Sequence, residues 1–492
     1  MEVVPAIAAW AAATACQFGT VANGALGRHI CGTGVPDTSQ LIKDLSAGSQ
    51  ILLPADDGFT TASSRWNVYD EPTASIIIVP SAPEDVAKAV KFANAAKTPF
   101  LAVSGAHGAI SSLGNMNNGI EINLKKLNSV TVAADGKTAT IGGGALSKTV
   151  VDALWAAGKQ TGPGLGGGHG WLQGHYGLIS DQFVSMDVVL ADGSLRTIDA
   201  ESDLWWAMKG AGHNFGIVTK VTTKVFDIKH RGWARETMIF TGDKVEAVFD
   251  SINKNILKNG TQDIDVVNWA YMLNIPALDA NKPVIVLYLL QEGVEAVEAK
   301  HSTPFKTIGP INVENKPGSY LDLPGWTIIA LDSEPCQKAG LANIRFPLYI
   351  KTYDTAAIRS AYDLFAKGTH DTPEFANSIF LFEGYALQGL RSAPSESSAF
   401  AFRGDNVLTA PLISYKPTGK ELNEKAVKLG EDLRNILHTA TGRKTMHAYI
   451  NYAFRDTSEE MYGEEKWRQQ RLRTLKKKYD PHNRFSFYAP IA

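Results

Sequence analysis

Cysteine is scarce in this chain of 492 residues, which has only Cys16, Cys31 and Cys336. No C-x-x-C pair occurs, and this excludes zinc ribbons and thioredoxin-type redox motifs. Two arrangements stay open for the three thiols. Either Cys16 and Cys31 form a disulfide and leave Cys336 free, or all three are buried thiols.

An excess of charge of one sign is also missing. Lys and Arg number 48, Asp and Glu number 50, and the formal net charge is −2. Such a chain has no global field to attract nucleic acid, so we expect no nucleic-acid partner. Basic residues gather near the end of the chain, and their helical spacing around Leu472 and Leu475 predicts a solvated helix face: Arg468, Arg471, Arg473, Lys476, Lys477 and Lys478.

Long hydrophobic runs are absent, which excludes a polytopic membrane protein. The apolar stretch 1–16 is shorter than the roughly 20 residues that span a bilayer, so no membrane partner is expected. It is either a signal peptide, with small residues at Ala13 and Ala15, or an ordinary N-terminal helix. Together with the sequon at Asn259, it favours a secreted or endomembrane location, with a cytoplasmic one as the alternative.

The remaining composition is ordinary for a globular chain, with 44% hydrophobic and 20% charged residues. A chain of this length exceeds a single core, and we expect two or three packed units. Residues 75–79 and 99–103 read as buried strands around a helix over 81–96, whose first turn has a capping box with Ser81 as N-cap and Glu84 closing it. This is a β-α-β unit.

Further strands and helices follow in the first half of the chain. The pattern predicts strands within 119–142 and over 184–189, 195–198 and 217–225, a hairpin turn at 191–194, and helices over 147–158 and 204–208. Beyond residue 227 the glycine density drops, and strands such as 284–290 alternate with amphipathic helices to about residue 441. This second part is interpreted as a separate domain.

Glycine-rich loops carry the functional signal. Ser104 to Ala109 directly follow a strand, and small residues there let backbone N–H groups point into one cavity, as a diphosphate requires. A tight turn capped by His107 is the alternative. Residues 162–167 match G-x-G-x-x-G, but the strand-to-helix context of a nicotinamide Rossmann site is missing. Three glycine runs in one domain favour a large phosphate-bearing ligand.

Three histidines lie near these glycines: His169, His175 and His213. No carboxylate or cysteine accompanies them at metal-ligand spacing, so we expect no metal site. Packing or ligand-lining roles are the preferred interpretation.

Five segments, in order, resemble motifs of the berberine-bridge-enzyme-like flavoprotein oxidases, within the wider vanillyl-alcohol-oxidase group. The resemblance extends from about Arg65 to the C-terminus and rests on residues 104–107, 166–178, 210–219, 449–452 and 478–485. Two departures stand in the first loop, where Val103 replaces the usual arginine and Ala106 replaces a glycine. Neither prevents a backbone cradle.

The resemblance implies an α+β fold class. It implies a two-part PCMH-type FAD-binding domain and an α+β substrate domain with an antiparallel sheet flanked by helices. The expected boundaries are an N-terminal segment 1–64, the FAD-binding domain 65–228, the substrate domain 229–440 and a C-terminal segment 441–492 that returns to the FAD-binding domain.

FAD is the implied cofactor, attached covalently through His107 to its 8α-methyl group. Many relatives have a longer loop with a cysteine that makes a second flavin bond, but residues 159–164 contain none. The resemblance therefore implies either a single attachment through His107 or the loss of that loop from this chain. The residues implied to bind FAD are Ser104, Gly105, Ala106, His107, Gly108, Gly144, Gly166, Gly167, Gly168, Gly170, Leu172, Gly177, Asp181, Gly216, Ile217, Val218, Asn451 and Tyr452.

The implied reaction is an oxidase reaction on a small, hydrophobic natural product. A hydride passes from substrate to flavin N5, and dioxygen reoxidises the flavin to give hydrogen peroxide. Tyr449 is the first candidate for the base, provided that a cation lies beside it, because a free tyrosine has a pKa of about 10. Asn451 is expected to hydrogen-bond substrate or flavin. The oligomeric state is left open.

Glu383 is the second catalytic candidate, as a general base or amine anchor, or else an exposed strand glutamate. Strand alternation places Glu383 and Tyr385 on one face and Phe382 on the other. Arg403 either pairs with Glu383, binds an acidic substrate or forms a surface salt bridge. Alternatives for the whole protein are an oligosaccharide or alcohol oxidase, a non-redox cyclase of Diels-Alderase type on the same fold, and a degenerate binding protein without flavin.

Overall fold

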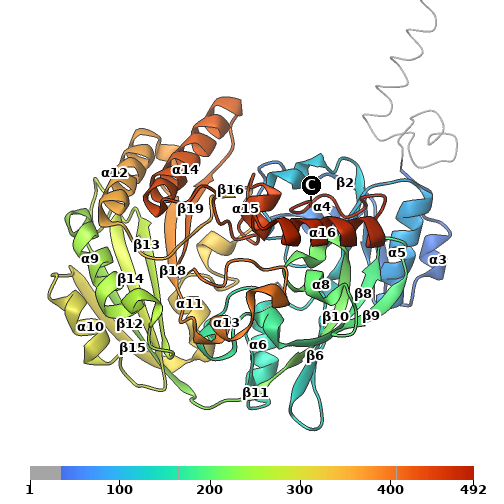
Figure 1. Cartoon of the computed structure of the whole chain (residues 1–492). Helices are drawn as coiled ribbons and strands as arrows, with labels where there is room; N and C mark the ends of the chain where they lie inside the picture. Colours follow the sequence, from blue (N-terminus) through green and yellow to red (C-terminus); the bar gives the residue numbers. More distant parts are fainter. Residues whose placement is uncertain (1–34, 163–166, 406, 492) are drawn as a thin grey trace, which may run out of the picture.

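The computed structural model describes residues 35–162, 167–405 and 407–491. The apolar N-terminal stretch, Cys16, Cys31 and Gly166 lie outside the described residues. Figure 1 shows one large sheet with its helices on the left and two smaller sheets on the right. The first half of the chain builds the right side, and the last helices return to it.

The first sheet has the strand order β1-β2-β4-β3. Its strands are β1 (Gln50–Leu52), β2 (Ala74–Val79), β3 (Phe100–Val103) and β4 (Gly119–Asn123). β2 and β3 both run parallel to β4, and helix α5 (Pro83–Ala95) connects β2 to β3. Val86, Ala89 and Val90 of α5 pack with Ile76 and Ile120 of the sheet. The predicted β-α-β unit is confirmed.

The predicted cap of α5 is wrong in its register. Ala82 is the N-cap, and the carboxylate of Asp85 accepts a hydrogen bond from the Ala82 N–H at 3.2 Å. Pro83 explains the shift, because proline fixes φ and needs no N–H partner at the first helical position. Ser81 instead donates through its hydroxyl to the Ala47 carbonyl oxygen at 3.1 Å.

The second sheet is antiparallel and has the order β5-β6-β10-β8-β9. Gly193, with φ of 76°, turns β8 into β9 as the sequence predicts. Short helices pack nearby. The elements are β5 (Val130–Val132), β6 (Thr138–Gly142), β8 (Phe183–Leu190), β9 (Leu195–Asp199), β10 (Gly216–Lys224), α6 (Ser147–Ala156), α7 (Gln173–Tyr176) and α8 (Trp205–Ala211), with β7 (Lys159–Gln160) paired to β11 (Phe226–Asp227).

The large sheet is antiparallel throughout and has the order β15-β12-β14-β13-β18-β19-β16, with β17 paired to β19. Its strands are β12 (Gly232–Phe240), β13 (Val266–Leu273), β14 (Val284–Glu292), β15 (Asn312–Ser319), β16 (Ala342–Arg345), β17 (Leu348–Ile350), β18 (Ile379–Gly384) and β19 (Val407–Tyr415). Two shorter helices, α10 (Ala299–Lys306) and α11 (Leu323–Trp326), lie in the connections before β15 and β16.

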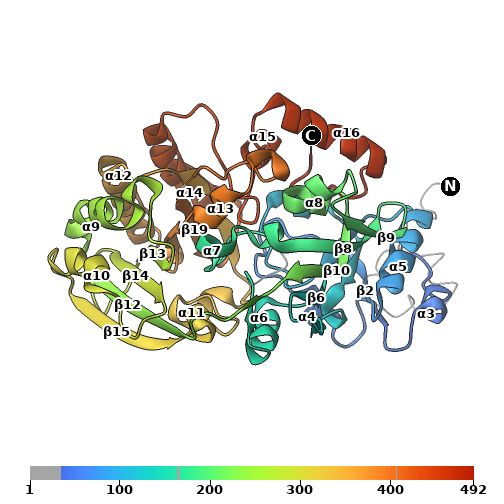
Figure 2. The same cartoon turned by 60° about the horizontal axis from the view of Figure 1, so that its bottom comes forward.

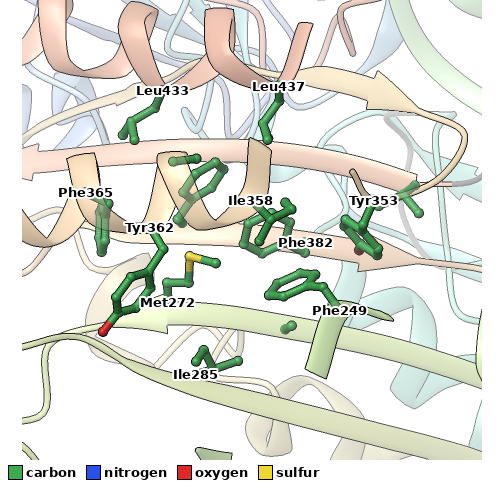
Figure 3. Packing of buried hydrophobic residues seen from close by; sticks show 14 of the residues in the cluster. Phe249, Met272, Ile285, Tyr353, Ile358, Tyr362, Phe365, Phe382, Leu433 and Leu437 are labelled. Carbon is green, nitrogen blue, oxygen red and sulfur yellow. The ribbon is translucent and has the colours of Figure 1, made fainter. Parts of the chain in front are cut away.

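Helices cover one face of this sheet: α9 (Val245–Ser251), α12 (Thr355–Asp371) and α14 (Lys420–Thr441). Figure 3 shows this packing, with Phe382, Met272 and Ile285 facing Phe365 and Leu433. Alternate residues of a strand point to opposite faces. The residues next to Phe382 in β18, one of which is Glu383, therefore point away from the helices and toward the smaller sheets.

The C-terminal segment packs on the first half of the chain. Ala448, Ile450 and Leu472 share one buried cluster with Ile141 and Val188 of the second sheet. The segment carries α15 (Ser458–Tyr462) and α16 (Lys466–Tyr479), and Figure 2 shows α16 lying over α8.

The prediction that the basic residues of α16 form a solvated face is wrong for two of them. Arg468 is fully buried and donates to the Ser398 carbonyl oxygen at 2.8 Å. Lys476 is also buried, and it donates to the Asn214 carbonyl oxygen at 2.9 Å and to Asp480 at 2.7 Å. These long side chains hold α16 in place because each donates to backbone carbonyls of the chain that α16 packs on.

The structure has an α+β architecture, which confirms the predicted fold class. The expected domain boundaries stay predictions, although β11 ends at Asp227 and β12 begins at Gly232, on either side of residue 228. No helix among the described residues is long and apolar enough to cross a bilayer. Asn259 is exposed in a turn, and the location of the protein stays a prediction.

Candidate active site

A cavity of about 1600 Å³ lies between the smaller sheets and the uncovered face of the large sheet. Two of its walls differ in construction. The loop wall consists of residues 104–108, 143, 167–170 and 216–218. The sheet wall consists of Trp269, Tyr271, Ile379, Leu381, Glu383 and Tyr385. Tyr449, Asn451 and Tyr452 of the C-terminal segment also line the cavity.

The loop wall presents backbone rather than side chains. Within the described residues, the N–H groups of residues 105–108 have no hydrogen-bond acceptor in the protein. Ala106 has φ of 59°, the left-handed conformation that a glycine adopts without strain. A Cβ atom on Gly143 would lie 2.0 Å from the Val218 carbonyl oxygen, so only glycine allows this close approach.

These features fit the FAD that the resemblance implies. Successive N–H groups without acceptors among the described residues offer donors to the oxygens of a diphosphate. The cavity also exceeds the roughly 300–1000 Å³ of common small-molecule pockets, and it therefore has room for a dinucleotide and a substrate together.

His107 lies at the edge of the loop wall, with its ring accessible from the cavity. It stacks on the indole of Trp66, with ring centres 5.5 Å apart and planes 3° apart. Partial burial and the positive charges of Arg345 and Lys338 lower the pKa of His107 to about 4. The imidazole is therefore neutral at neutral pH, and one ring nitrogen has a free lone pair.

Glu383 is the central polar group of the sheet wall. It is only 2% exposed, and its two carboxylate oxygens accept hydrogen bonds from the hydroxyls of Tyr385 and Tyr452, each at 2.8 Å. Burial raises the pKa of Glu383, while the two hydroxyls and the Arg345 charge oppose the rise. The alternative of an exposed strand glutamate is thus excluded.

Tyr449 hydrogen-bonds in a different way. Its hydroxyl oxygen accepts from the side-chain amide of Asn451 at 2.8 Å and from the His169 backbone N–H at 3.3 Å. Burial raises the pKa of Tyr449 to about 12, and the neighbouring Glu383 carboxylate acts in the same direction. The hydroxyl is therefore protonated at neutral pH, and a base role for Tyr449 stays a prediction. Since the oxygen already accepts twice, its proton is available to a ligand.

His169 connects the loop wall to the large sheet. Its Nδ1 contacts the side-chain oxygen of Gln173, whose amide nitrogen donates to the Ala386 carbonyl oxygen. Nδ1 must therefore carry the proton, and Nε2 accepts from the Tyr349 hydroxyl at 2.5 Å. Burial lowers the pKa of His169 to about 4, so the ring stays neutral.

Most of the predicted site residues line the cavity together. They are Ser104, Gly105, Ala106, His107, Gly108, Gly167, Gly168, Gly170, Gly216, Ile217, Val218, Glu383, Tyr449, Asn451 and Tyr452. Among the described residues, four predicted FAD contacts lie behind the wall instead: Gly144, Leu172, Gly177 and Asp181. Gly166 lies outside the described residues.

The four residues behind the wall support it through packing and charge. Asp181 forms a buried two-point ion pair with Arg403, at 2.6 and 2.9 Å, so Arg403 pairs with Asp181 and not with Glu383. Gly144 lets the backbone approach the Leu124 carbonyl oxygen, where a Cβ would clash at 1.8 Å. Gly177 has φ of 75°, and Leu172 is buried among aromatic rings.

Four residues of the site have no motif around them and escape the sequence analysis. Trp66 stacks on His107, and Arg65 borders the loop wall. Arg345, at the end of β16, lies over the rings of Trp66 and Tyr452, 4.6 and 4.1 Å from their centres. Cys336, also in the lining, is a free thiol. Only their contacts in the fold identify them.

The three histidines near the glycine runs have separate surroundings. His169 and His213 line the cavity, whereas His175 pairs with Glu292 at 3.0 Å. In residues 35–162, 167–405 and 407–491, no cluster of three metal-ligating side chains occurs.

Two segments that contribute to the cavity match known protein families. Residues 74–199 match the FAD binding domain family, and residues 448–492 match the family of berberine and berberine-like segments. The chain is 50% identical to the FAD-linked oxidoreductase chyH of Penicillium rubens, over 100% of both chains. It is 48% identical to the FAD-linked oxidoreductase chry5 of Gibberella zeae, over 93% of this chain and 95% of that one.

Among solved structures, the berberine-bridge-enzyme-like 1 protein of Physcomitrella patens superposes with a TM-score of 0.76. It covers 93% of this chain and 100% of its own, at 21% sequence identity. The predicted PCMH-type fold, the FAD cofactor and the oxidoreductase activity are thereby confirmed. The chain belongs to the family of berberine-bridge-enzyme-like FAD-linked oxidoreductases.

Proposed function

We propose that the protein is an oxidase that holds FAD covalently through His107 and oxidises a small, hydrophobic natural product. The observation that carries this proposal is the buried carboxylate of Glu383, held by two tyrosine hydroxyls in the wall that faces the FAD-binding loops. It is a base placed beside the space for a substrate.

The bound FAD would accept a hydride from a substrate carbon and pass the electrons to dioxygen, which yields hydrogen peroxide. Glu383 would receive the proton that leaves the neighbouring O–H or N–H group of the substrate. Tyr452 is more exposed to the cavity than Glu383, and its hydroxyl would take the substrate proton while giving its own to the carboxylate. The raised pKa of Glu383 suits such a base, because general bases work best near the ambient pH.

Tyr449 and Asn451 would position the reactants. The Tyr449 hydroxyl keeps its proton at neutral pH and would donate it to an oxygen or nitrogen of the bound ligand. The side-chain amide of Asn451 and the His169 N–H both donate to the Tyr449 hydroxyl oxygen. These two bonds would orient the hydroxyl proton for donation to a ligand in advance of binding.

Attachment through His107 is supported by the state of its ring. The neutral imidazole offers a nitrogen lone pair at the edge of the loop wall, and stacking on Trp66 limits its orientation. The single attachment stays our expectation. Cys336 does line the cavity, but it lies far in sequence from residues 159–164. It follows Pro335, whose carbonyl oxygen accepts a hydrogen bond from the indole N–H of Trp66.

A hydrophobic substrate is supported by the aromatic residues of the sheet wall and its surroundings. Trp171 packs edge-on against Trp269, with ring centres 5.6 Å apart, and Tyr271, Tyr320 and Trp326 border the same space. Flat rings of this kind bury large apolar area and suit planar ligands.

The first experiment is an absorbance spectrum of the purified protein before and after acid precipitation. Flavin colour that stays in the pellet supports covalent attachment, and His107→Ala should release it to the supernatant. If the wild-type colour moves to the supernatant, the attachment proposal is wrong although FAD binding stands.

The second experiment separates the oxidase from its alternatives. Hydrogen peroxide is measured with a panel of aromatic alcohols, aromatic amines and oligosaccharides. Turnover of aromatic compounds with equimolar peroxide supports the proposal, and turnover of sugars alone would favour the oligosaccharide oxidase. Product formation without oxygen consumption would favour the cyclase.

A further inference from the structure

Arg65 is a buried arginine without a hydrogen-bond partner. It lies in the segment before β2, and the N–H of its neighbour Trp66 donates to the Ala106 carbonyl oxygen at 3.1 Å, which fixes this segment on the loop wall. The side chain is 6% exposed. Within the described residues, its Nε and Nη1 atoms contact no acceptor.

Arg65 borders a side cavity of about 230 Å³, which shares residues 102–104 and 106–108 with the main cavity. Gly216 and Ile217 line both cavities, and residues 485–488 close the side cavity. Arg65 is the only charged residue in the lining that the structure describes, because burial lowers the pKa of His213 to about 4 and His107 is neutral as well.

Nearby carboxylates do not neutralise Arg65. Glu121 and Glu71 are the acidic groups that act on it, and they only partly oppose the burial that lowers its pKa. Neither forms an ion pair with it within 4.0 Å among the described residues. A buried charge without a partner is strongly unfavourable, and an anion bound at this point would offset that cost.

A diphosphate supplies that anion. Arg65 lines the side cavity together with Ala106, His107 and Gly108, whose N–H groups have no acceptor among the described residues. An arginine fork matches phosphate oxygens with two parallel hydrogen bonds. Val103, at the end of β3, offers no charge of its own. We propose that Arg65 binds the diphosphate of FAD and supplies the positive charge that the glycine loop lacks.

The proposal rests on FAD binding and is independent of the oxidase reaction. It is tested in the His107→Ala background, where flavin binds without a covalent bond. Dissociation constants of FAD and of riboflavin, which has no phosphate, are measured on flavin-free protein by quenching of flavin fluorescence.

Arg65→Gln should weaken FAD binding by about 10- to 100-fold, the range for hydrogen bonds to a charged group. Riboflavin binding should stay within twofold, and the dependence of FAD affinity on salt should become shallower. Arg65→Lys keeps the charge near Glu121 and protects the fold. It should weaken FAD binding by about tenfold, since the two-point contact is lost.

Glu121→Gln is the control for a purely structural role. If Arg65 serves only to offset Glu121, the double variant Arg65→Gln with Glu121→Gln regains FAD binding, and the proposal falls. It also falls if FAD binding is unchanged or if both flavins weaken together. Failure of His107→Ala with native Arg65 to bind FAD would instead contradict noncovalent FAD binding itself.

Discussion

The loop wall and the sheet wall enclose one cavity by opposite means. The loop wall presents backbone N–H groups without acceptors among the described residues, mostly from small residues. The sheet wall presents side chains, and the Glu383 carboxylate accepts hydrogen bonds from the hydroxyls of Tyr385 and Tyr452. We therefore expect cofactor binding at the loop wall to depend mainly on backbone conformation, and substrate binding at the sheet wall to depend on the identity of the side chains.

This difference predicts where substitutions hurt chemistry and where they hurt the fold. A change in the sheet wall should alter rates while the protein stays folded and yellow. A change behind the loop wall should alter stability first. Each prediction below tests one side of that division.

The largest effect is expected for Glu383→Gln. The rate of flavin reduction by substrate should fall by about 10²- to 10⁴-fold, because the base is lost while the amide keeps the size of the side chain. In the wild type, the rate should rise with pH through the pKa of Glu383, which burial places above its usual 4.5, and this limb should vanish in the variant. Stopped-flow absorbance measures both.

Tyr385→Phe is the matched control. It removes one hydrogen bond that favours the ionised carboxylate, so the acidic limb should move to higher pH with a smaller loss of maximal rate. A Glu383→Gln enzyme that reduces its flavin within threefold of the wild-type rate would contradict the role of Glu383.

The next effect is expected for Arg403→Ala, which leaves the buried Asp181 without its partner. Breaking a buried ion pair in this way costs about 3–5 kcal/mol of folding free energy. Chemical denaturation of the variant should show this loss. Asp181→Asn tests the same pair from the loop side. If it weakened FAD binding without lowering stability, Asp181 would belong to the cofactor contacts after all.

The smallest effect is expected for Ala106→Gly, a change within the loop wall itself. At φ of 59° a non-glycine residue carries about 1–2 kcal/mol of strain, which glycine would relieve. Glycine also loses more chain entropy on folding, and this offsets part of the gain. The free energy of unfolding should increase by about 0.5–1 kcal/mol, and the melting temperature should rise accordingly. Ala109→Gly, at a buried site without positive φ, should lower it. Equal losses in both variants would exclude relief of strain at Ala106.

The sequence predicts the loop wall well because its chemistry is local. A strand followed by Ser104 to Gly108 places those N–H groups without help from distant residues. Even there, the FAD contacts of Asp181 and Gly144 stay predictions, since the sequence cannot distinguish a residue that contacts a ligand from one that holds the contacting loop. The prediction of Ser81 as N-cap is wrong for a different reason: Pro83 prefers the first helical position, and this makes Ala82 the N-cap.

The sheet wall is predicted only in part. Alternation correctly places Glu383 and Tyr385 on one face, but the period does not say which face is open. The bond from Tyr452 to Glu383 spans 69 residues, and the stacking of Arg345 between Trp66 and Tyr452 joins three distant segments. Contacts between residues so far apart in the sequence produce no motif or periodic spacing from which they could be predicted.

The return of the C-terminal segment to the first half has a consequence for synthesis on the ribosome. Tyr449 and Tyr452 enter the cavity, and residues 485–488 close its side pocket, only after nearly the whole chain has been made. A nascent chain that ends before residue 449 has neither these hydroxyls nor the closing residues. The cavity is therefore complete only after the C-terminal segment has been made and has packed on the first half.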